Sequence, residues 1–431
     1  MKALFANDDP GCYPPSWYAQ TATPLPPAPP LQGATRTDVC IVGAGYAGLT
    51  AALELRARGF DVTVLEAHRA GFGASGRNGG QVGSGFNRGQ QELERTMGEG
   101  PARALWDLAE EAKALTRAQV ARHAPEARLR DGGAHGAYGP REAQALAQEA
   151  EHLSRRYGYE QITAFDAPGF EQIVRSPRYR GGIVDQGAAH LHPLRYVLGL
   201  ARAAKAAGVH LFENSAVHRL TEGPELHTAH GSVRADHVIL AGNGYLPDLA
   251  RGVSARSMPI NSFIGATEPL PDPRAVLTRD IAVADSKFVV NYFRLSEDNR
   301  LLFGGRESYS ALFPKDIATR LHARMVALFP QLGAARFSHV WGGTLSITRS
   351  RLPLVMRVDR DVLSVGGFSG HGVALSALSG KIAAEAIAGQ SERFDLMASL
   401  PTPRFPGGSA LRAPLLTAAM TWYAMRDRLG V

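Results

Sequence analysis

Three closely spaced glycines, Gly43, Gly45 and Gly48, lie between a strand-like apolar run and a helix-like segment near the N-terminus. Glycine at these positions permits a tight turn, lets the backbone approach a pyrophosphate, and lets the helix pack closely on the strand. The helix N-terminus behind them supplies unpaired N–H groups and a positive dipole for a phosphate. Glu66 ends the next apolar run, eighteen residues beyond Gly48, where a carboxylate can accept hydrogen bonds from a ribose. The spacing predicts a βαβ unit that binds an adenine dinucleotide.

Two further glycine-rich segments help to choose between dinucleotides. One covers residues 70–85, and the other, Gly366 to Gly372, follows a strand-like run and precedes a helix. Glycine costs backbone entropy on folding, so runs of it in an enzyme indicate close approach to a large ligand. The second helix N-terminus, behind Gly370 and His371, can stabilise the negative charge that develops on a reduced flavin ring. Three such segments favour an extended FAD over a nicotinamide cofactor.

The elements that position these glycines follow from chain length and pattern. A chain of 431 residues is too long for one compact core, which predicts two domains. Apolar periodicity and turn residues predict the individual elements. They are a helical region at 101–157, a helix at 193–207, short strands between 210 and 241, a β-rich region at 256–310 with a hairpin over 291–303, and a strand at 362–365 followed by a helix to about 388.

The order of these elements predicts an α/β fold in which strands from both ends of the chain share one parallel sheet. A Rossmann-like dinucleotide-binding domain is assigned to residues 36–100, 178–255 and 340–400. A β-sheet-rich substrate domain is assigned to residues 101–177 and 256–339. The ends are expected to be a proline-rich, extended lead-in at 1–35 and a helical tail at 401–431.

Composition argues against several functional classes. The net charge of +7 comes from scattered basic residues, without the basic stripe that a nucleic-acid surface needs. The two cysteines, Cys12 and Cys40, form neither a zinc motif nor a disulfide framework. Residues 413–425 are apolar but shorter than the roughly 20 residues that span a bilayer, and the N-terminus lacks a secretory signal. We expect a cytoplasmic protein with no membrane span and no nucleic-acid partner.

The glycine segments and two further motifs resemble the glycine oxidase/D-amino-acid oxidase family of FAD-dependent amine oxidoreductases over nearly the whole chain. The motifs that carry the resemblance are Gly43–Glu66, Gly73–Gln81, Leu302–Arg306, Trp341–Gly343 and Gly366–Gly372. Within the family the chain is most similar to γ-glutamylputrescine oxidoreductases, through Ser16, Trp17 and Tyr18 and the segment 403–408. The resemblance implies an FAD cofactor and a substrate domain of the D-amino-acid oxidase type.

The three glycine segments and this resemblance together give a set of expected cofactor contacts. They are Gly43, Gly45, Tyr46, Ala47, Gly48, Glu66, Ala67, Ser75, Gly76, Arg77, Asn78, Gly79, Gly80, Gln81, Val217, Ala241, Gly242, Gly370, His371, Gly372 and Val373. Relatives that attach the flavin covalently use a Cys near the segment that here is 348–353, or a His near the position of Arg77. Neither residue type stands at these places, so the FAD is expected to be non-covalent.

Two departures from the family bear on the reaction. Glycine-oxidase-type relatives hold the substrate α-carboxylate with Arg at two positions, which here are Leu345 and Gly370. A bidentate Arg–carboxylate pair suits α-amino-acid recognition, so its absence favours a carboxylate far from the reacting carbon, as in a γ-glutamyl amide. Arg306, Arg349 or Arg351 could hold it from another direction. Sarcosine-oxidase relatives also carry a Lys that helps to activate oxygen, and residues 301–303 contain none.

The chemistry expected is oxidation of an amine C–N bond by hydride transfer to flavin N5, hydrolysis of the imine, and reoxidation by O₂ to give H₂O₂. The candidate catalytic residues are His371, Tyr292 and Arg306, and the candidate substrate contacts are Arg294, Trp341 and Arg349. Structural roles stay open for three of them: a tight turn for His371, an ion pair for Arg294 and core packing for Trp341.

The substrate expected from the resemblance is γ-glutamylputrescine or a similar polyamine conjugate. Two alternatives stay open. One is an L-pipecolate-like imino-acid or amino-acid oxidase, which an Arg at carboxylate distance from the flavin would favour. The other is a flavin-binding subunit or dehydrogenase that passes electrons to a partner.

Overall fold

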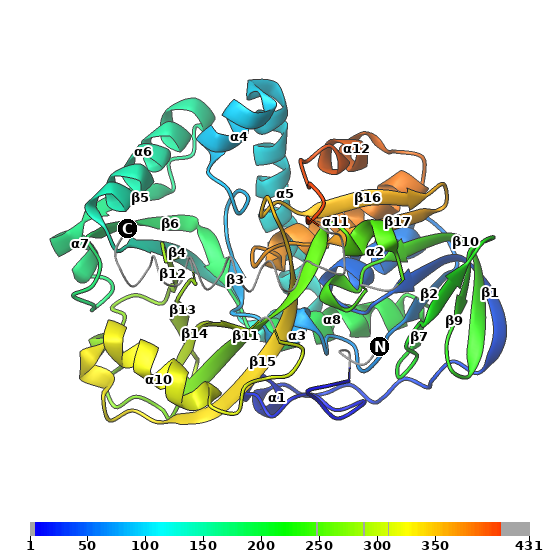
Figure 1. Cartoon of the computed structure of the whole chain (residues 1–431), viewed down its shortest axis with the longest axis horizontal. Coiled ribbons are helices and arrows are strands. Elements are labelled where there is room, and N and C mark those ends of the chain that lie inside the picture. The colour runs from blue at the N-terminus through cyan, green and yellow to red at the C-terminus, as the bar shows by residue number, and fades with distance from the viewer. Residues whose placement is uncertain (1–4, 247–248, 288, 309, 407–431) are drawn as a thin grey trace.

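The computed structural model describes residues 5–406 except 247–248, 288 and 309, together with all side chains in that part other than those of residues 306 and 307. It contains two β-sheets side by side, with helices packed around them (Figure 1). Most of the expected helical tail, residues 407–431, lies outside the described part of the chain.

The first sheet has eight strands among the described residues, in the order β16-β17-β10-β1-β2-β7, with β9 pairing with β10 and β8 with β9. The strands are β1 (Gly33–Val42), β2 (Val62–Leu65), β7 (His210–Phe212), β8 (Arg219–Thr221), β9 (Glu225–His227), β10 (Gly231–Leu240), β16 (Leu354–Asp359) and β17 (Val362–Gly366). β1 runs parallel to β2 and β10, and β10 runs parallel to β17. Strands from both ends of the chain therefore share one parallel sheet, as the sequence predicts.

Helices cover this sheet because its strands are apolar on both faces, which is typical of parallel sheets. α11 packs against α2 and α5, and α8 packs against α2. The helices described are α1 (Trp17–Thr21), α2 (Tyr46–Ala57), α3 (Ala74–Arg77), α4 (Gln90–Met97), α5 (Glu99–His123), α6 (Pro140–Tyr157), α7 (Ala167–Glu171), α8 (Pro193–Ala206), α9 (Arg251–Ser254), α10 (Ile317–Leu328), α11 (Val373–Ile387) and α12 (Glu392–Ala398).

The second sheet has nine strands among the described residues, in the order β15-β11-β14-β13-β12-β4-β6-β3, with β5 beside β6. The strands are β3 (Gln81–Val82), β4 (Arg130–Ala137), β5 (Ile162–Asp166), β6 (Gly181–His190), β11 (Ser257–Thr267), β12 (Ala282–Asp285), β13 (Tyr292–Leu295), β14 (Leu301–Ser308) and β15 (Phe337–Thr348). β13 and β14 pair as the predicted hairpin.

Three expectations about local structure were wrong. The predicted helical region at 101–157 is interrupted by β4, whose glycines disfavour a helix; Gly132 has φ +108°, which a right-handed helix does not allow. Of the strands expected between 210 and 241, His210–Phe212 is confirmed as β7, but the two expected at 232–234 and 237–241 form one continuous β10, which pairs with β1 along its length. The lead-in at 1–35 contains the short helix α1, capped by the Ser16 hydroxyl, which accepts a hydrogen bond from the Ala19 N–H at 3.1 Å.

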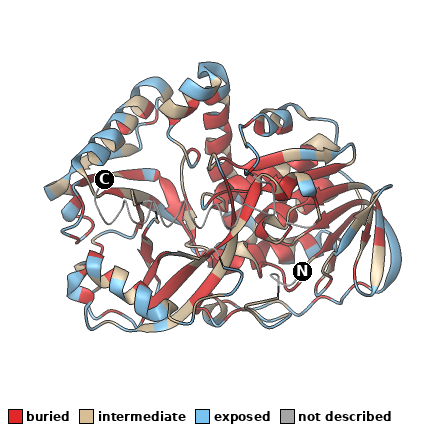
Figure 2. Ribbon diagram, in the orientation of Figure 1, coloured by how far each residue is buried: buried red, intermediate tan, exposed pale blue. Residues whose placement is uncertain are grey.

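Buried residues are concentrated in the two sheets and the helices packed on them, whereas the outer faces of α6 and α10 are exposed (Figure 2). The division of the chain into domains stays a prediction. β3, β6 and β15 lie wholly or largely within ranges assigned to the dinucleotide-binding domain, yet they pair in the nine-stranded sheet.

Candidate functional site

A cavity of about 990 Å³ lies between the two sheets. Val42, Leu65 and Ala241, at the carboxyl ends of β1, β2 and β10, line one side of it. The opposite wall is formed by strands of the nine-stranded sheet, β4, β6, β11, β12, β13 and β15. Ligands of α/β proteins bind beyond the carboxyl ends of parallel strands, and a cavity of this size suits a cofactor together with a small substrate.

The first glycine turn is shaped by what surrounds it. Gly43 has φ +105°, and a Cβ atom there would lie 3.0 Å from the carbonyl oxygen of Ala241. A Cβ atom on Gly45 would lie 2.7 Å from Ser75 Oγ, which accepts a hydrogen bond from the Tyr46 N–H at 3.1 Å. Gly45 is the N-cap of α2 and makes no side-chain capping bond, so the start of α2 is open to the cavity. This end of the cavity fits a pyrophosphate.

Two glycines inside helices bring the glycine-rich turn before α11, residues 366–372, to the same cavity. A Cβ atom on Gly48 would lie 1.9 Å from the carbonyl oxygen of Gly43, and one on Gly380 would lie 2.1 Å from that of Ala47. α11 therefore approaches the backbone of α2 closely, and the two helices begin at the same cavity. Gly380 was missed in the sequence, although an isolated glycine in a helical pattern is a sign of close packing.

The Glu66 carboxylate lies at the dinucleotide end of the cavity, half-buried. Its Oε2 accepts a hydrogen bond from the Ala44 N–H at 2.8 Å, and its Oε1 accepts one from the His68 N–H at 3.0 Å. Burial raises the pKa of Glu66, and the backbone N–H groups oppose that shift. A carboxylate has about four lone-pair positions, so these two bonds leave capacity for ribose hydroxyls.

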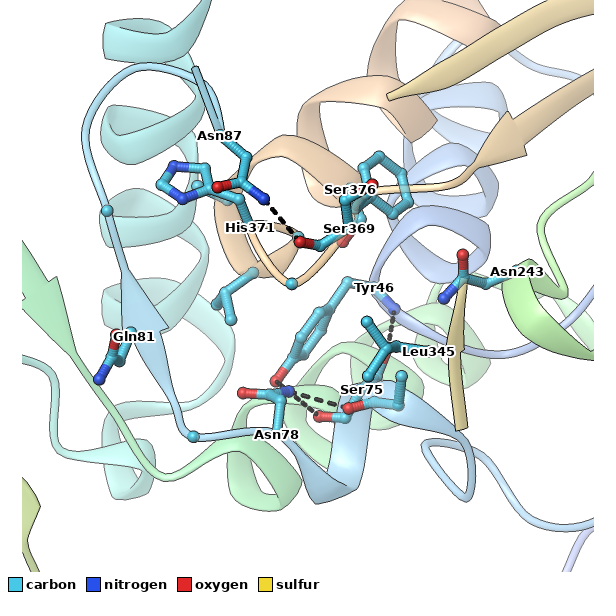
Figure 3. A pocket seen from close by; sticks show the side chains of 18 of the residues that line it. Tyr46, Ser75, Asn78, Gln81, Asn87, Asn243, Leu345, Ser369, His371 and Ser376 are labelled. Atoms are coloured by element: carbon cyan, nitrogen blue, oxygen red, sulfur yellow. Dashed lines mark hydrogen bonds between the residues drawn. The ribbon is translucent and has the colours of Figure 1, made fainter. Parts of the chain in front are cut away.

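The loop between α3 and β3 is held from within. Asn78 Nδ2 donates to the carbonyl oxygens of Ala74 and Ser75 at 3.0 Å each, and Asn78 Oδ1 accepts from the Gly80 N–H at 2.7 Å (Figure 3). Gln81 Nε2 donates to the carbonyl oxygen of Val283 at 2.9 Å. Both side chains line the cavity, but their hydrogen bonds are used to shape the loop. A ligand would therefore meet mainly the backbone of the loop.

Arg77, the last residue of α3 and next to this loop, is held by the N-terminal segment. Its side chain is 2% exposed and its Nη1 donates to both carboxylate oxygens of Asp8, at 3.0 and 2.9 Å. Nη1 also donates to the carbonyl oxygen of Gly342 at 3.1 Å, while Trp341 Nε1 donates to the Arg77 carbonyl oxygen at 3.0 Å. Residues near the N-terminus thus help to fix this loop, which sequence patterns did not indicate.

The turn before α11 is tied to the loop that follows β3. Asn87 Nδ2 donates to the carbonyl oxygen of Ser369 at 2.7 Å (Figure 3). The His371 ring packs against Gly83, where a Cβ atom would lie 2.5 Å from its Cε1. Burial lowers the pKa of His371 and favours the neutral imidazole, while the backbone groups of Gly83 and Gly85 oppose that shift. Its Nε2 is buried without a hydrogen-bond partner among the described residues.

A buried polar network lies behind the same loop. Lys113 Nζ donates to Ser84 Oγ at 2.6 Å and to Tyr159 OH at 2.9 Å. Both hydroxyl groups donate to Asp185, whose carboxylate oxygens lie 2.6 Å from Ser84 Oγ and 2.5 Å from Tyr159 OH. The side chain of Lys113 is 5% exposed and also pairs with Glu110 at 2.8 Å. Sequence patterns missed this network, because its members are far apart in the chain.

Of the six side chains expected at the reaction centre, two line the cavity. Tyr292 reaches it from β13 and its OH lies 3.1 Å from Ser262 Oγ, and His371 reaches it from the turn before α11. Arg306 belongs to β14, but its side chain is outside the described part of the structure.

The other three expected residues are placed elsewhere and have structural partners. Arg294 is buried and donates to the carbonyl oxygens of Gly79 at 2.9 Å and Leu191 at 3.0 Å. Trp341 is buried beneath the loop that holds Arg77. Arg349 is exposed and donates to the carbonyl oxygen of Arg404 at 3.0 Å.

Most residues expected to contact the cofactor do line the cavity. They are Gly43, Gly45, Tyr46, Ala47, Glu66, Ala67, Ser75, Arg77, Asn78, Gly79, Gln81, Val217, Ala241, Gly242, Gly370, His371, Gly372 and Val373. Gly48, Gly76 and Gly80 lie behind the lining, where they permit close packing of the backbone. α11 begins at Gly372 without a side-chain capping bond, so a second helix N-terminus is open to the cavity. The two open helix N-termini fit a dinucleotide that carries a flavin.

Within the described residues, no group of three or more His, Cys, Asp or Glu side chains is arranged to hold a metal ion. The helices of that part also include none long and apolar enough to cross a bilayer.

Comparisons with known proteins agree with this geometry. The model of a family described as "FAD dependent oxidoreductase" matches residues 38–386. A protein of Rhizobium meliloti named "Probable oxidoreductase OrdL" is 39% identical, over 96% of this chain and 97% of its own. The γ-glutamylputrescine oxidoreductase of Escherichia coli K12 is 38% identical, over 96% of this chain and 99% of its own. Glycine oxidase from Geobacillus kaustophilus has a similar fold, with a TM-score of 0.72 and 24% identity over 86% of this chain and 99% of its own.

Proposed function

The chain belongs to the FAD-dependent oxidoreductase family, and we propose that it oxidises the terminal amine of γ-glutamylputrescine or of a similar polyamine conjugate. The cavity between the two sheets carries this proposal, because its substrate-facing wall is almost uncharged. The described side chains of that wall include no arginine or lysine, and its one carboxylate, Asp185, is bonded to Ser84 and Tyr159. Burial lowers the pKa of His135, on the same wall, to about 4, so this imidazole is neutral at pH 7.

Such a wall suits a neutral amine and does not suit an α-carboxylate beside the reacting carbon. A carboxylate at that place would need a guanidinium partner to offset its desolvation. A substrate whose charged groups lie far from the amine avoids that cost. The relative of Escherichia coli named γ-glutamylputrescine oxidoreductase supports this choice of substrate class.

The cofactor would be held by the residues already described at the two helix N-termini and at Glu66. When bound, FAD supplies an acceptor for the hydride that leaves the carbon bearing nitrogen. The protein's own contribution is to orient the amine and exclude water. Tyr292 and Ser262 place hydroxyl groups on the cavity wall, and the neutral His371 can accept a proton without first losing one.

Anaerobic mixing of the holoenzyme with candidate amines tests this proposal. γ-Glutamylputrescine is expected to bleach the flavin absorption band, whereas L-pipecolate is not. Bleaching by L-pipecolate alone would favour the alternative imino-acid reaction, and bleaching by neither compound would reject the proposed substrate class.

Three further expectations remain predictions. Production of H₂O₂ on admission of air would identify O₂ as the acceptor, and its absence would favour a dehydrogenase with a partner. Release of FAD on acid precipitation would confirm that the cofactor is non-covalent. Recovery of the protein in the cytoplasmic fraction would confirm the expected location.

A further inference from the structure

The charged side chains that line the cavity number six in the described residues, three arginines and three carboxylates. Three of them have assignments. Glu66 lies at the dinucleotide end, Arg77 is paired with Asp8, and Asp185 belongs to the network of Lys113. The remaining three are Arg88, Glu149 and Arg351. We call these three residues the rim.

The rim residues come from three separate segments and meet through their neighbours. Arg88 lies in the loop after β3, and its Nε donates to the carbonyl oxygen of Ser350 at 2.8 Å, next to Arg351. Glu149 lies on α6 and its Oε1 accepts a hydrogen bond from the N–H of Gln90, two residues after Arg88. The three segments that carry these residues are therefore joined to one another where they line the cavity.

Two rim residues, Arg88 and Glu149, keep capacity for a ligand. Arg88 uses Nε on Ser350 and Nη1 on Glu92, at 3.0 Å, and its Nη2 group donates no hydrogen bond to another described residue. The Arg88–Glu92 pair is 37% and 41% exposed, and such exposed pairs are worth about 1 kcal/mol or less. Glu149 is half-buried, and a carboxylate has more lone pairs than its two present donors, Gln90 and Gln91, occupy.

We propose that the rim binds the α-ammonium and α-carboxylate groups at the far end of the substrate, with Arg88 on the carboxylate and Glu149 on the ammonium. This inference rests on the proposed function and adds the substrate's second recognition point. The uncharged wall would bind the reacting amine, and the rim would bind the zwitterionic head, which carries the α-ammonium and the α-carboxylate. A glutamyl head attached through its side-chain carbonyl presents both charges together, whereas an acyl head without charges presents neither.

Two pairs of substrates test the rim. γ-Glutamylputrescine and N-acetylputrescine share the reacting amine and the amide but differ in the charged head. Anaerobic reduction of the holoenzyme at several amine concentrations separates apparent affinity from the limiting rate. The wild-type protein is expected to bind γ-glutamylputrescine at least tenfold more tightly, because charge-assisted hydrogen bonds to a head group are worth roughly 1.5–3 kcal/mol each. Equal affinity for the two amines would overturn the proposal.

Substitutions of Arg88 and Glu149 show which charged group of the substrate each residue binds. Arg88→Ala is expected to lower the affinity for γ-glutamylputrescine about tenfold or more and to leave the affinity for N-acetylputrescine unchanged. The limiting rate of flavin reduction should be unchanged for both amines. Arg88→Lys should restore part of the affinity. Glu149→Gln should lower the affinity for γ-glutamylputrescine but not the affinity for N-succinylputrescine, which carries a carboxylate without an ammonium. Arg349→Ala is the matched control, because that exposed guanidinium lies outside the cavity. Equal loss for both amines in Arg88→Ala would show a structural effect and overturn the assignment.

A binding measurement separates failure of the rim from failure of the proposed function. N⁵-ethyl-L-glutamine has the zwitterionic head and the amide but no reacting amine. Calorimetry with the holoenzyme should detect its binding to the wild-type protein and the loss of that binding in Arg88→Ala. If no amine reduces the flavin but this ligand binds, the proposed reaction is wrong and the proposal for the rim is supported. If the ligand does not bind, the rim proposal is wrong whatever the reaction.

Discussion

The side-chain amide of Asn87 donates a 2.7 Å hydrogen bond to the carbonyl oxygen of Ser369, and so joins the loop after β3 to the turn before α11 (Figure 3). These two segments are about 280 residues apart in the chain, yet each contributes to the lining of the cofactor cavity. Their relative position is fixed by this bond together with the packing of the His371 ring against Gly83.

Replacement of Asn87 by Ala should weaken cofactor retention. Loss of one hydrogen bond of this kind costs about 1 kcal/mol, which corresponds to an affinity for FAD about fivefold lower. Fluorescence of FAD released after dilution measures this directly. Gln144→Ala removes an amide from the exposed face of α6 and should leave retention unchanged. Identical retention in the Asn87 variant and the wild type would show that the contact does not hold the two segments.

Replacement of Gly380 by Ala should separate α11 from α2. The added methyl group would lie 2.1 Å from the Ala47 carbonyl oxygen, so backbone must move. Overpacking of this type costs about 1–3 kcal/mol, and both thermal stability and FAD binding should fall. Gly100→Ala, in α5, meets no atom within 4 Å and should be neutral or slightly stabilising. Comparable melting temperatures for the two variants would contradict the close approach of the helices.

Replacement of Lys113 by Met should destabilise the fold, because it removes the cation that pairs with Glu110 and donates to Ser84 and Tyr159, the two hydroxyl groups bonded to the buried Asp185 carboxylate. A buried polar group that loses its partner typically costs about 1–3 kcal/mol. Addition of Asp185→Asn to Lys113→Met removes the buried carboxylate charge and should recover part of the loss. Urea unfolding of the single and double variants measures both effects. A single variant as stable as the wild type would show that Lys113 and Asp185 are not coupled.

The buried His135 should make stability depend on pH. Burial lowers the pKa of its imidazole from 6.5 to about 4, so between these values the unfolded chain binds more protons than the folded one. Stability contributed by this residue therefore rises as the pH increases from about 4 to 6.5 and is constant above that range. His135→Gln should flatten this part of the profile, measured by urea unfolding at a series of pH values. An unchanged slope in the variant would assign the pH dependence to other groups.

The sequence was sufficient for the parts of the fold that local patterns determine. The βαβ unit around Gly43 and Glu66, the hairpin of β13 and β14, and the strand that precedes Gly366 were all predictable from apolar runs and turn residues. The family and its cofactor followed from the same glycines.

The roles of individual side chains in the site could not be predicted, because they depend on contacts between segments that are distant in the chain. Arg294 resembles a substrate contact in sequence, but the fold turns it towards the carbonyl oxygens of Gly79 and Leu191. Lys113 has helical neighbours that show no sign of its partner Asp185, which lies on β6. Arg88 was not singled out, because its position at the cavity depends on how the loop after β3 meets residue 350. Side-chain roles of this kind are set by tertiary packing, which local patterns do not encode.

The decisive measurement is anaerobic mixing of the holoenzyme with γ-glutamylputrescine. We expect the flavin absorption band to be bleached and the product to be the aldehyde formed when the imine of the terminal amine hydrolyses. L-Pipecolate and glycine, which carry a carboxylate beside the reacting carbon, should leave the band unchanged. Bleaching by either of these two compounds, with none by γ-glutamylputrescine, would show that the proposed substrate class is wrong.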